Sequence, residues 1–534
     1  MYVYNPQDHH GPTLYYAAAA LQKATGHNST ATLDGTLLRC TPIIFSVLAL
    51  LFGVLAVRKL SGRIWHGILF ALLLGTSPIF VFFSTDFIQE MLLASFTIMM
   101  LWAGIGYLRL GGKLKPGSWA LLFGITAGLA FATKETSVLT FVAASIAALP
   151  FAIPHLREAK ARTRDAVLAL AGFVLTAMLF YSSFGNNWHG VYNAFIAAPF
   201  SYLHRAIGSA ASQGAAAHIH PWWQYLEWLF FGKIAITHNS AGLHISGTYT
   251  NVCAGAYVLI CCTIPLMFRR ARQAITPALL RPFTFLSLYT SILLALYSAI
   301  PYKTPWCTLQ IHLGYLATSF LGILIFGELI VGFSQWLKRK DPTTRSCGWV
   351  LNPSKGRTLI AFVATSVLVA AIILTEYVPQ LIRINRDTDS KDIPYNYASA
   401  SPQVKELASL IIESLKVSER ESLKDATSQT TKPSNAQTLK HSNLQTLKPS
   451  NLFAAIVLPP EDTWPLPFYL RSIKDRVGYW TSFGELEALA GLGQKPNVVV
   501  VPAEEGHLVQ PLFPHLKNTK RFEMRPHVRV RAFW

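Results

Sequence analysis

Two carboxylates at the edge of an apolar run are the residues best suited to chemistry in this sequence. Asp86 and Glu90 stand four residues apart in Val81–Leu93, which reads VFFSTDFIQEMLL. Residues at i and i+4 share one face of a helix, and ionisable side chains beside a membrane span indicate a functional site. The alternative is structural, because Asp86 followed by Gln89 is also typical of a capping box. The pair therefore predicts an acidic site, a helix cap, or both.

Two lysines among aromatic residues indicate an anionic ligand. Lys134 lies in Ala132–Thr136 (ATKET), directly before Glu135, and Lys303 lies in Tyr302–Trp306 (YKTPW). Phosphate is a suitable counter-charge for a lysine at a membrane edge, so one interpretation is a lipid phosphate or diphosphate site. The alternatives are a Lys134–Glu135 ion pair that holds a hairpin, and lysine side chains that extend from span ends toward water.

Tryptophans are concentrated near the same segments. Trp222 and Trp223 lie in Pro221–Tyr225 (PWWQY), and Trp306 follows the second lysine motif. Such a cluster can serve as a platform for a sugar ring or a prenyl chain. The alternative is an aromatic belt at the membrane boundary.

Cofactor motifs are absent from the sequence. It contains no P-loop, no GxGxxG after a strand, no HExxH and no GxSxG. The adjacent His9 and His10 are poorly placed to bind one metal ion from a regular element. No cofactor is therefore evident, and a divalent metal ion stays an open alternative.

The composition is that of a membrane protein. Of 534 residues, 51% are hydrophobic and only 14% are charged, whereas a soluble protein is about a quarter charged. The net charge of +19 would suggest nucleic acid in a soluble protein. Here most basic residues stand in short loops between apolar runs, as the positive-inside rule requires. We therefore expect a bilayer as partner and no nucleic acid.

The apolar runs predict roughly ten transmembrane helices. Basic loops occupy every second connection, so every unusual polar motif described above falls on the opposite, extracytoplasmic face. We expect a multi-pass protein of the cell membrane. The expected spans are 41–57, 64–83, 87–108, 118–132, 137–153, 166–183, 252–268, 282–300, 311–333 and 358–378.

The composition changes after the last expected span. A polar stretch leads into an amphipathic helix whose apolar face includes Val404, Leu407, Leu410 and Ile411. Three repeats of eight residues follow, too polar to bury a core, and then a small α/β unit whose last run, Met524–Phe533, alternates like an edge strand. The expected divisions are an outer segment (1–40), a transmembrane domain (41–380), a linker with the amphipathic helix (381–418), a repeat insert (419–452) and an extracytoplasmic α/β domain (453–534).

The ordered set of motifs resembles a known superfamily. The chain is similar to the polytopic GT-C membrane glycosyltransferases, which include protein O-mannosyltransferases and lipid A aminoarabinose transferases, and within them to the flippase-activity-associated group linked to archaeal N-glycosylation. The likeness spans almost the whole chain. It rests on His10-Gly11-Pro12, Leu14-Tyr15-Tyr16, Phe82–Glu90, Ala132–Thr136, Pro221-Trp222 and Lys303–Trp306, in this order.

The resemblance implies an all-α polytopic fold and the transfer of a sugar from a polyprenyl-phosphate donor to a glycan, lipid or protein acceptor. Asp86 and Glu90 would then be catalytic, because the reaction needs a group that takes the acceptor proton. Cations would hold the leaving phosphate, and aromatic rings would hold the sugar. The expected substrate-binding residues are Asp8, His10, Lys134, Glu135, Trp222, Trp223, Lys303 and Trp306.

The sequence departs from this pattern at its start. Such enzymes normally begin with a span and an acidic motif, usually Asp-Glu, which stands before the segment that here contains His10. We expect the principal acid of the family to lie before residue 1. Two alternatives follow, a non-catalytic carrier or flippase-associated component for lipid-linked sugars, and a truncated inactive homologue.

Overall fold

The computed structural model divides into two compact units, and each is described by itself. The first comprises Met1–Asn28, Leu33–Asp387 and Asp392–Tyr395, and the second comprises Ser29–Thr32, Thr388–Lys391 and Asn396–Trp534. The residues that the structure describes are 3–5, 10–27, 35–108, 115–152, 159–206, 219–231, 277–338, 355–386, 403–429, 453–459, 463, 466–525 and 528–534.

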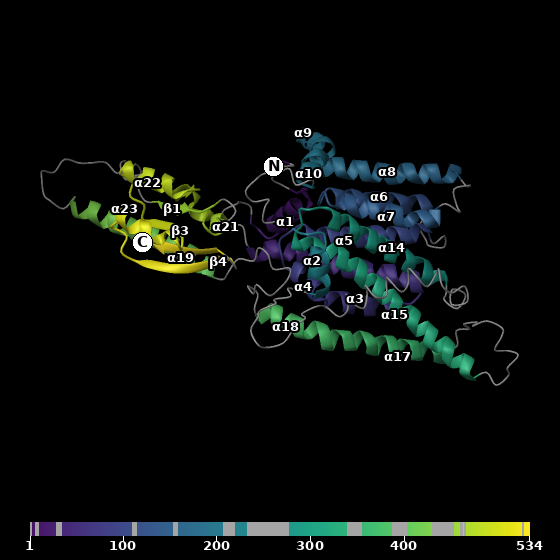
Figure 1. Cartoon of the computed structure of the whole chain (residues 1–534). Helices are drawn as coiled ribbons and strands as arrows, with labels where there is room; N and C mark the ends of the chain where they lie inside the picture. Colours follow the sequence, from purple (N-terminus) through teal and green to yellow (C-terminus); the bar gives the residue numbers. More distant parts are fainter. Residues whose placement is uncertain are drawn as a thin grey trace. The chain divides into compact units, whose positions relative to one another are not determined.

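The described part of the first unit is helical, and its long helices lie side by side (Figure 1). Its first half contains α1 (Thr13–Ala24), α2 (Gly35–Ser61), α3 (Ile64–Gly75), α4 (Pro78–Ser84), α5 (Glu90–Leu108), α6 (Pro116–Phe131), α7 (Ser137–Ala152) and α8 (Ala159–Tyr181). Its second half contains α9 (Trp188–Tyr192), η3 (Asn193–Ala197), α10 (Ala198–Ala206), α11 (Gln224–Leu226), η5 (Glu227–Phe231), α14 (Pro277–Ala299), η6 (Pro305–Cys307), α15 (Thr308–Lys338), α17 (Lys355–Ile372), η7 (Ile373–Tyr377) and α18 (Val378–Arg386).

The helices identify a multi-pass membrane protein. Within the described residues, six are long and apolar enough to cross a bilayer, or seven if the bent pair α3 and α4 forms one span. Helices α6 and α7 are apolar but shorter, as the sequence predicts for a hairpin around Lys134. The expected span at 252–268 lies outside the described residues.

A sharp bend separates α3 from α4. The two axes differ by 72°, and Pro78 stands in the first turn of α4. Proline lacks the N–H that would continue the α3 hydrogen-bond ladder, so the helix must restart there. The buried Ser77 at this break is 2.6 Å from His312 Nε2 through its hydroxyl. The bend leads the chain into the short connection before α5, in which Asp86 lies.

Small residues bring α6 and α8 together. A Cβ atom added to Gly124 would lie 1.9 Å from the Ala169 carbonyl oxygen, and one added to Gly128 would lie 2.7 Å from that of Phe173. Glycines allow helix backbones in membranes to approach this closely. The Tyr181 hydroxyl at the end of α8 consequently donates a hydrogen bond to the Phe131 carbonyl at 3.0 Å. This packing fixes the end of α6 just before Lys134.

The second unit contains a mixed five-stranded sheet with the order β2-β1-β3-β5-β4. Strands β1, β2 and β3 are parallel, and β5 pairs antiparallel with both β3 and β4. The strands are β1 (Ala454–Val457), β2 (Val477–Trp480), β3 (Val498–Pro502), β4 (Thr519–Arg525) and β5 (Val528–Phe533). The helical elements are α19 (Gln403–Gln429), α21 (Leu466–Tyr469), η8 (Arg471–Arg476), α22 (Phe483–Gly491), η9 (Glu505–Leu508) and α23 (Val509–Leu512).

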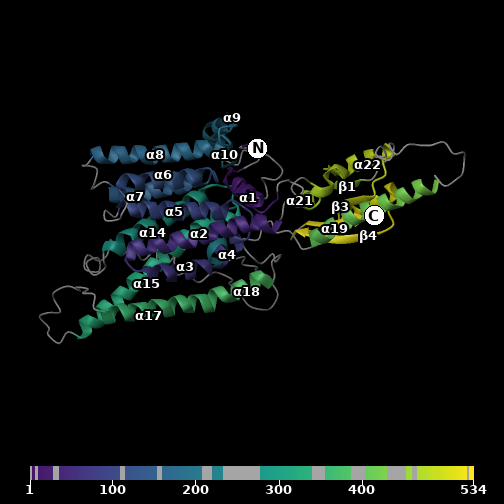
Figure 2. The ribbon, with the colours of Figure 1, turned by 180° about the vertical axis from the view of Figure 1, so that it is seen from behind.

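Helix α19 is part of this unit and covers one face of the sheet (Figure 2). Val404, Leu407 and Ile411 are fully buried against that face, so the apolar stripe read from the sequence is the contact surface. The prediction that the last run forms an edge strand is wrong, because β5 lies between β3 and β4. The edge strand next to β5 is β4, which is missed because its residues, TKRFEMR, are mostly charged.

Candidate functional site

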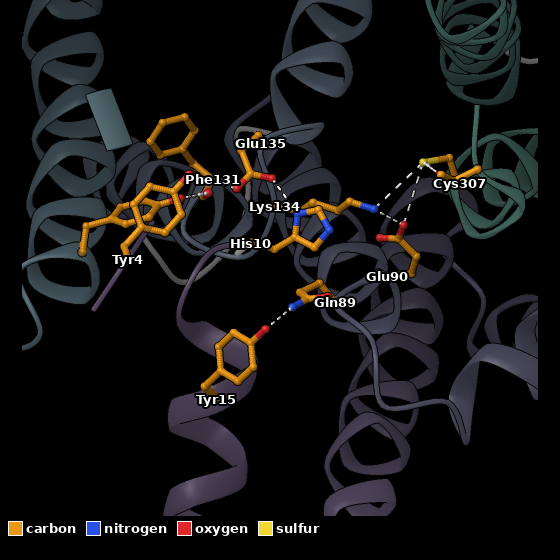
Figure 3. A network of polar contacts seen from close by, with 11 residues as sticks. Tyr4, His10, Tyr15, Gln89, Glu90, Phe131, Lys134, Glu135 and Cys307 are labelled. Atoms are coloured by element: carbon orange, nitrogen blue, oxygen red, sulfur yellow. Dashed lines mark hydrogen bonds and ion pairs between the residues drawn. The ribbon is translucent and has the colours of Figure 1, made fainter. Parts of the chain in front are cut away.

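Side chains from four separate chain segments meet at helix ends of the first unit. The segments are the start of α5, the turn between α6 and α7, the η6 turn before α15, and the N-terminal residues around His10 (Figure 3). The contacts below join segments that are distant in sequence, so the fold and not local propensity assembles the site.

Glu90 and Lys134 form a buried ion pair at the centre. The Lys134 ammonium donates to Glu90 Oε1, and the two residues are only 3% and 1% exposed. Glu90 occupies the first turn of α5, where the helix dipole favours a negative charge. Its other oxygen, Oε2, is buried and has no hydrogen-bond partner among the described residues. A buried carboxylate oxygen without a partner costs free energy, and this atom is able to accept a hydrogen bond from a ligand group.

Three side chains, those of Cys307, Trp306 and Gln310, surround the ion pair. The Cys307 thiol lies 4.0 Å from Lys134 Nζ and 3.9 Å from Glu90 Oε1, and the ammonium lies 5.8 Å from the centre of the Trp306 ring. The Gln310 side chain donates to the Glu90 backbone carbonyl at 3.4 Å. Burial alone would lower the pKa of Lys134, but Cys307 and Glu90 hold it above its ordinary value. The lysine is therefore a cation here.

Glu135 builds a second network on the other side of the same turn. Its carboxylate accepts a hydrogen bond from the Tyr4 hydroxyl at 3.0 Å and contacts His10 Nδ1 at 2.9 Å. Burial would raise the pKa of Glu135, but the hydrogen bond and charge of His10 hold it below its ordinary value. The predicted Lys134–Glu135 ion pair is therefore wrong, because the two consecutive side chains bind different partners.

Close backbone contact holds the N-terminal segment against this turn. A Cβ atom on Gly11 would lie 2.1 Å from the Ala132 carbonyl oxygen, so glycine is what permits the approach. Two hydrogen bonds reinforce it, from Thr13 N to the Ala132 carbonyl at 3.4 Å and between the Thr13 and Thr133 hydroxyls at 2.7 Å. His10 owes its position beside Glu135 to this contact.

Asp86 and Glu90 do not share a helix face. Helix α5 begins only at Glu90, and Asp86 is an exposed residue in the preceding connection. Gln89 donates to the Tyr15 hydroxyl at 3.2 Å, so the predicted capping box is wrong as well. Sequence spacing pointed to both acids, but the structure brings only Glu90 into the buried cluster.

Lys303 is buried, which contradicts the interpretation that it extends to water. Only 1% exposed, it donates to the carbonyl oxygens of Ser298, in the last turn of α14, and of Ile300, just beyond that helix. Burial lowers its pKa. The next residue, Thr304, donates its N–H to the Tyr225 hydroxyl at 3.3 Å and contacts the Cys307 thiol at 3.2 Å. Lys303 thus stabilises the turn that presents Cys307 to the ion pair.

The two adjacent tryptophans lie on a neighbouring loop. Trp222 and Trp223 are 62% and 50% exposed and make an edge-to-face contact. Their segment is tied to the Lys303 turn by a bridge between Ile219 and Tyr302. They remain available to a ligand, whereas Asp8 lies outside the described residues.

Sequence reasoning missed several members of the cluster. Cys307, Gln310, Tyr4 and Thr13 carried no motif of their own, although Cys307 directly follows the YKTPW segment. Their roles depend on contacts between residues more than one hundred positions apart. Among the described residues, no group of three or more His, Cys, Asp or Glu side chains is arranged to hold a metal ion.

Known proteins are similar to this chain in sequence over part of its length and in fold over most of it. Residues 9–181 match the family described as dolichyl-phosphate-mannose-protein mannosyltransferase. The crystal structure of ArnT from Cupriavidus metallidurans bound to undecaprenyl phosphate superposes with a TM-score of 0.54 at 13% identity, covering 98% of this chain and 87% of ArnT. The chain is therefore similar to the mannosyltransferase family over residues 9–181 and to ArnT in its fold.

Two further solved structures are similar to this chain. The apo structure of the same ArnT gives a TM-score of 0.52 at 13% identity, with the same coverage. An oligosaccharyltransferase from Archaeoglobus fulgidus gives 0.42 at 13% identity, covering 95% of this chain and 61% of that protein. No curated protein sequence matches this chain. The all-α polytopic fold with a small α/β unit, expected from the motifs, is confirmed.

Proposed function

We propose that this chain is a membrane glycosyltransferase that moves a sugar from a polyprenyl-phosphate donor to an acceptor hydroxyl on the extracytoplasmic face. The GT-C fold and the match to a mannosyltransferase family support a transferase. The ArnT neighbour was crystallised with undecaprenyl phosphate, which supports a lipid-phosphate donor. The basic loops support an extracytoplasmic site and an extracytoplasmic C-terminal unit through the positive-inside rule.

The observation that carries the proposal is the free oxygen of Glu90. A carboxylate held by one oxygen, with the other buried and unpartnered, is prepared to accept a hydrogen bond from an incoming hydroxyl. Glu90 Oε2 would take the hydroxyl proton while the acceptor oxygen bonds to the sugar C1. The bond from C1 to the phosphate oxygen breaks, and polyprenyl phosphate leaves.

The remaining candidates fit the needs of this reaction. His10, partly exposed and oriented by Glu135, is proposed to face the leaving phosphate, whereas Lys303 as a phosphate ligand stays a prediction. Trp306, beside the ion pair, is proposed to face the sugar, while Trp222 and Trp223 would contact the sugar or the prenyl chain. Lys134 as a phosphate ligand stays a prediction, as does a catalytic role for Asp86.

The decisive experiment replaces Glu90. Purified chain in lipid nanodiscs is incubated with radiolabelled undecaprenyl-phosphate sugars and membrane extract as acceptor. Glu90→Gln keeps the shape and removes the base, so transfer should fall by about 10²–10⁴-fold. Asp165→Asn is the matched control. Asp165 is also a buried acid, but it lies near the start of α8, whereas the end of α8, at Tyr181, is the end that contacts the segment before Lys134. Full transfer by Glu90→Gln would refute the proposed role.

The carrier alternative predicts a different outcome. A component that only moves lipid-linked sugars would translocate the labelled donor across the bilayer without forming a glycosylated product. Translocation by the wild type, with no transfer and no effect of Glu90→Gln, would replace the enzyme proposal with the carrier proposal. Asp86→Asn in the transfer assay tests the second acid, with reduced turnover expected if Asp86 orients the acceptor.

A further inference from the structure

The Lys134 ammonium already has partners on several sides. It donates to Glu90 Oε1, lies 4.0 Å from the Cys307 thiol, and lies 5.8 Å from the centre of the Trp306 ring. An ammonium has three hydrogens to donate. With a side chain only 4% exposed, the cation is enclosed, and little of it is open to a phosphate group arriving from outside.

The backbone around Lys134 is fixed as well. Its N–H donates to the Ala130 carbonyl at 3.2 Å, and its own carbonyl accepts from Ser137 N at 3.1 Å. The next side chain, Glu135, is anchored in the opposite direction by Tyr4 and His10. The lysine therefore cannot turn toward a new ligand without breaking its contacts with Glu90 and Cys307.

Glu90 depends on this lysine. Its carboxylate is 1% exposed, and an ion that is buried without a counter-charge is strongly unfavourable. By binding Oε1 alone, Lys134 places a counter-charge beside the carboxylate and leaves Oε2 as the open atom. A contact between Lys134 and a donor phosphate would compete with this arrangement.

We infer that Lys134 is a positioning residue that acts through Glu90, fixing the orientation and charge of the acid that receives the acceptor proton, and that it does not bind the donor phosphate. The inference rests on the proposed function for the role of Glu90. It replaces the phosphate-ligand interpretation of the ATKET motif.

A double-mutant cycle separates the two roles. The variants are Lys134→Met, Glu90→Gln and the combination of both, with Lys134→Arg as the conservative replacement. If Lys134 acts through Glu90, Lys134→Met lowers kcat by about 100-fold or more with donor KM unchanged. The double variant is then no slower than Glu90→Gln. Lys134→Arg keeps part of the activity.

Direct binding of undecaprenyl phosphate provides a readout that needs no turnover. Lys134→Met should bind this lipid with a Kd within about twofold of the wild type, since no phosphate contact is lost. Lys59→Met is the matched control, because Lys59 is a lysine over another tryptophan ring, 4.3 Å from the centre of Trp119. Binding at least tenfold weaker in Lys134→Met alone would overturn the inference, as would multiplicative losses of kcat in the double variant.

Thermal unfolding distinguishes loss of folding from loss of function. Lys134→Met leaves Glu90 buried without its counter-charge, so its Tm should fall, and Glu90→Gln added to it should restore part of the Tm. Additive Tm losses would overturn the coupling. If the wild type transfers no sugar from any donor, the proposed function fails, while the binding and Tm cycles still test the role of Lys134.

Discussion

A single methyl group at Gly11 should disable the site without removing any polar side chain. In Gly11→Ala the new Cβ atom would lie 2.1 Å from the Ala132 carbonyl oxygen, whereas ordinary contact begins at 3.4 Å. The N-terminal segment must therefore retreat from the turn by about 1.3 Å, the difference between these distances. The hydrogen bond from Thr13 N to Ala132, already 3.4 Å long, would not survive this shift.

The magnitude follows from the two effects. Overpacking costs about 1–3 kcal/mol, and one lost hydrogen bond costs about 1 kcal/mol, so the free energy of unfolding should fall by about 2–4 kcal/mol. Misplacing a binding group by about 1 Å can cost about 100-fold in rate. Because His10 is in the displaced segment, we expect transfer to fall by about this factor.

The assays are sugar transfer per folded molecule, thermal unfolding in detergent, and hydrogen exchange of the amides in 10–16. Gly484→Ala is the control, since a Cβ at that position meets nothing within 4 Å. Exchange protection of 10–16 should decrease in Gly11→Ala and stay unchanged in the control. A Gly11→Ala protein with wild-type Tm, exchange and activity would refute the close contact on which the reasoning depends.

Two further perturbations test the electrostatics and the packing. The pKa of Glu135 is lowered in the folded chain from its ordinary value of 4.5, so its stabilising contribution is complete above that pH and is lost as pH falls through the lowered value. His10→Asn removes the imidazole that holds the pKa of Glu135 down. Thermal unfolding followed from about pH 3.5 to 6 should therefore show that the stabilising contribution of Glu135 begins to be lost at a higher pH than in the wild type. An unchanged profile would contradict the pairing. Gly124→Ala should lower the Tm by separating α6 from α8, because its Cβ would lie 1.9 Å from the Ala169 carbonyl oxygen, while Gly104→Ala, with its nearest contact at 3.7 Å, should have little effect.

The sequence alone predicted most of the helical architecture. Long apolar runs, such as the one that forms α5, have strong composition signals that do not depend on their neighbours. The apolar spacing of Val404, Leu407 and Ile411 likewise identified the buried face of α19. The prediction failed for β4, because its charged residues TKRFEMR pair as a strand only through contact with β5.

The site was predicted less completely, and for a physical reason. Residue type identified Glu90, Lys134 and His10, since ionisable groups near a membrane are energetically costly and therefore indicate a functional site. Their pairing depends on tertiary contacts that no local pattern encodes. One of the interpretations of the sequence paired Lys134 with its neighbour Glu135, whereas the fold pairs it with Glu90, forty-four positions earlier. Asp86 looked equivalent to Glu90 until the start of α5 separated them.

The α6–α7 turn has an implication for how such chains can vary. Two consecutive side chains, Lys134 and Glu135, contact different partners, Glu90 and His10. An insertion or deletion of one residue in the turn would point these side chains away from their partners and break both networks. The length of this turn should therefore stay constant among related sequences, even where its residues are substituted. Substitution at Lys134 should also be accompanied by substitution at Glu90. The turn is thus a reliable anchor for aligning distant relatives, which low overall identity otherwise makes difficult.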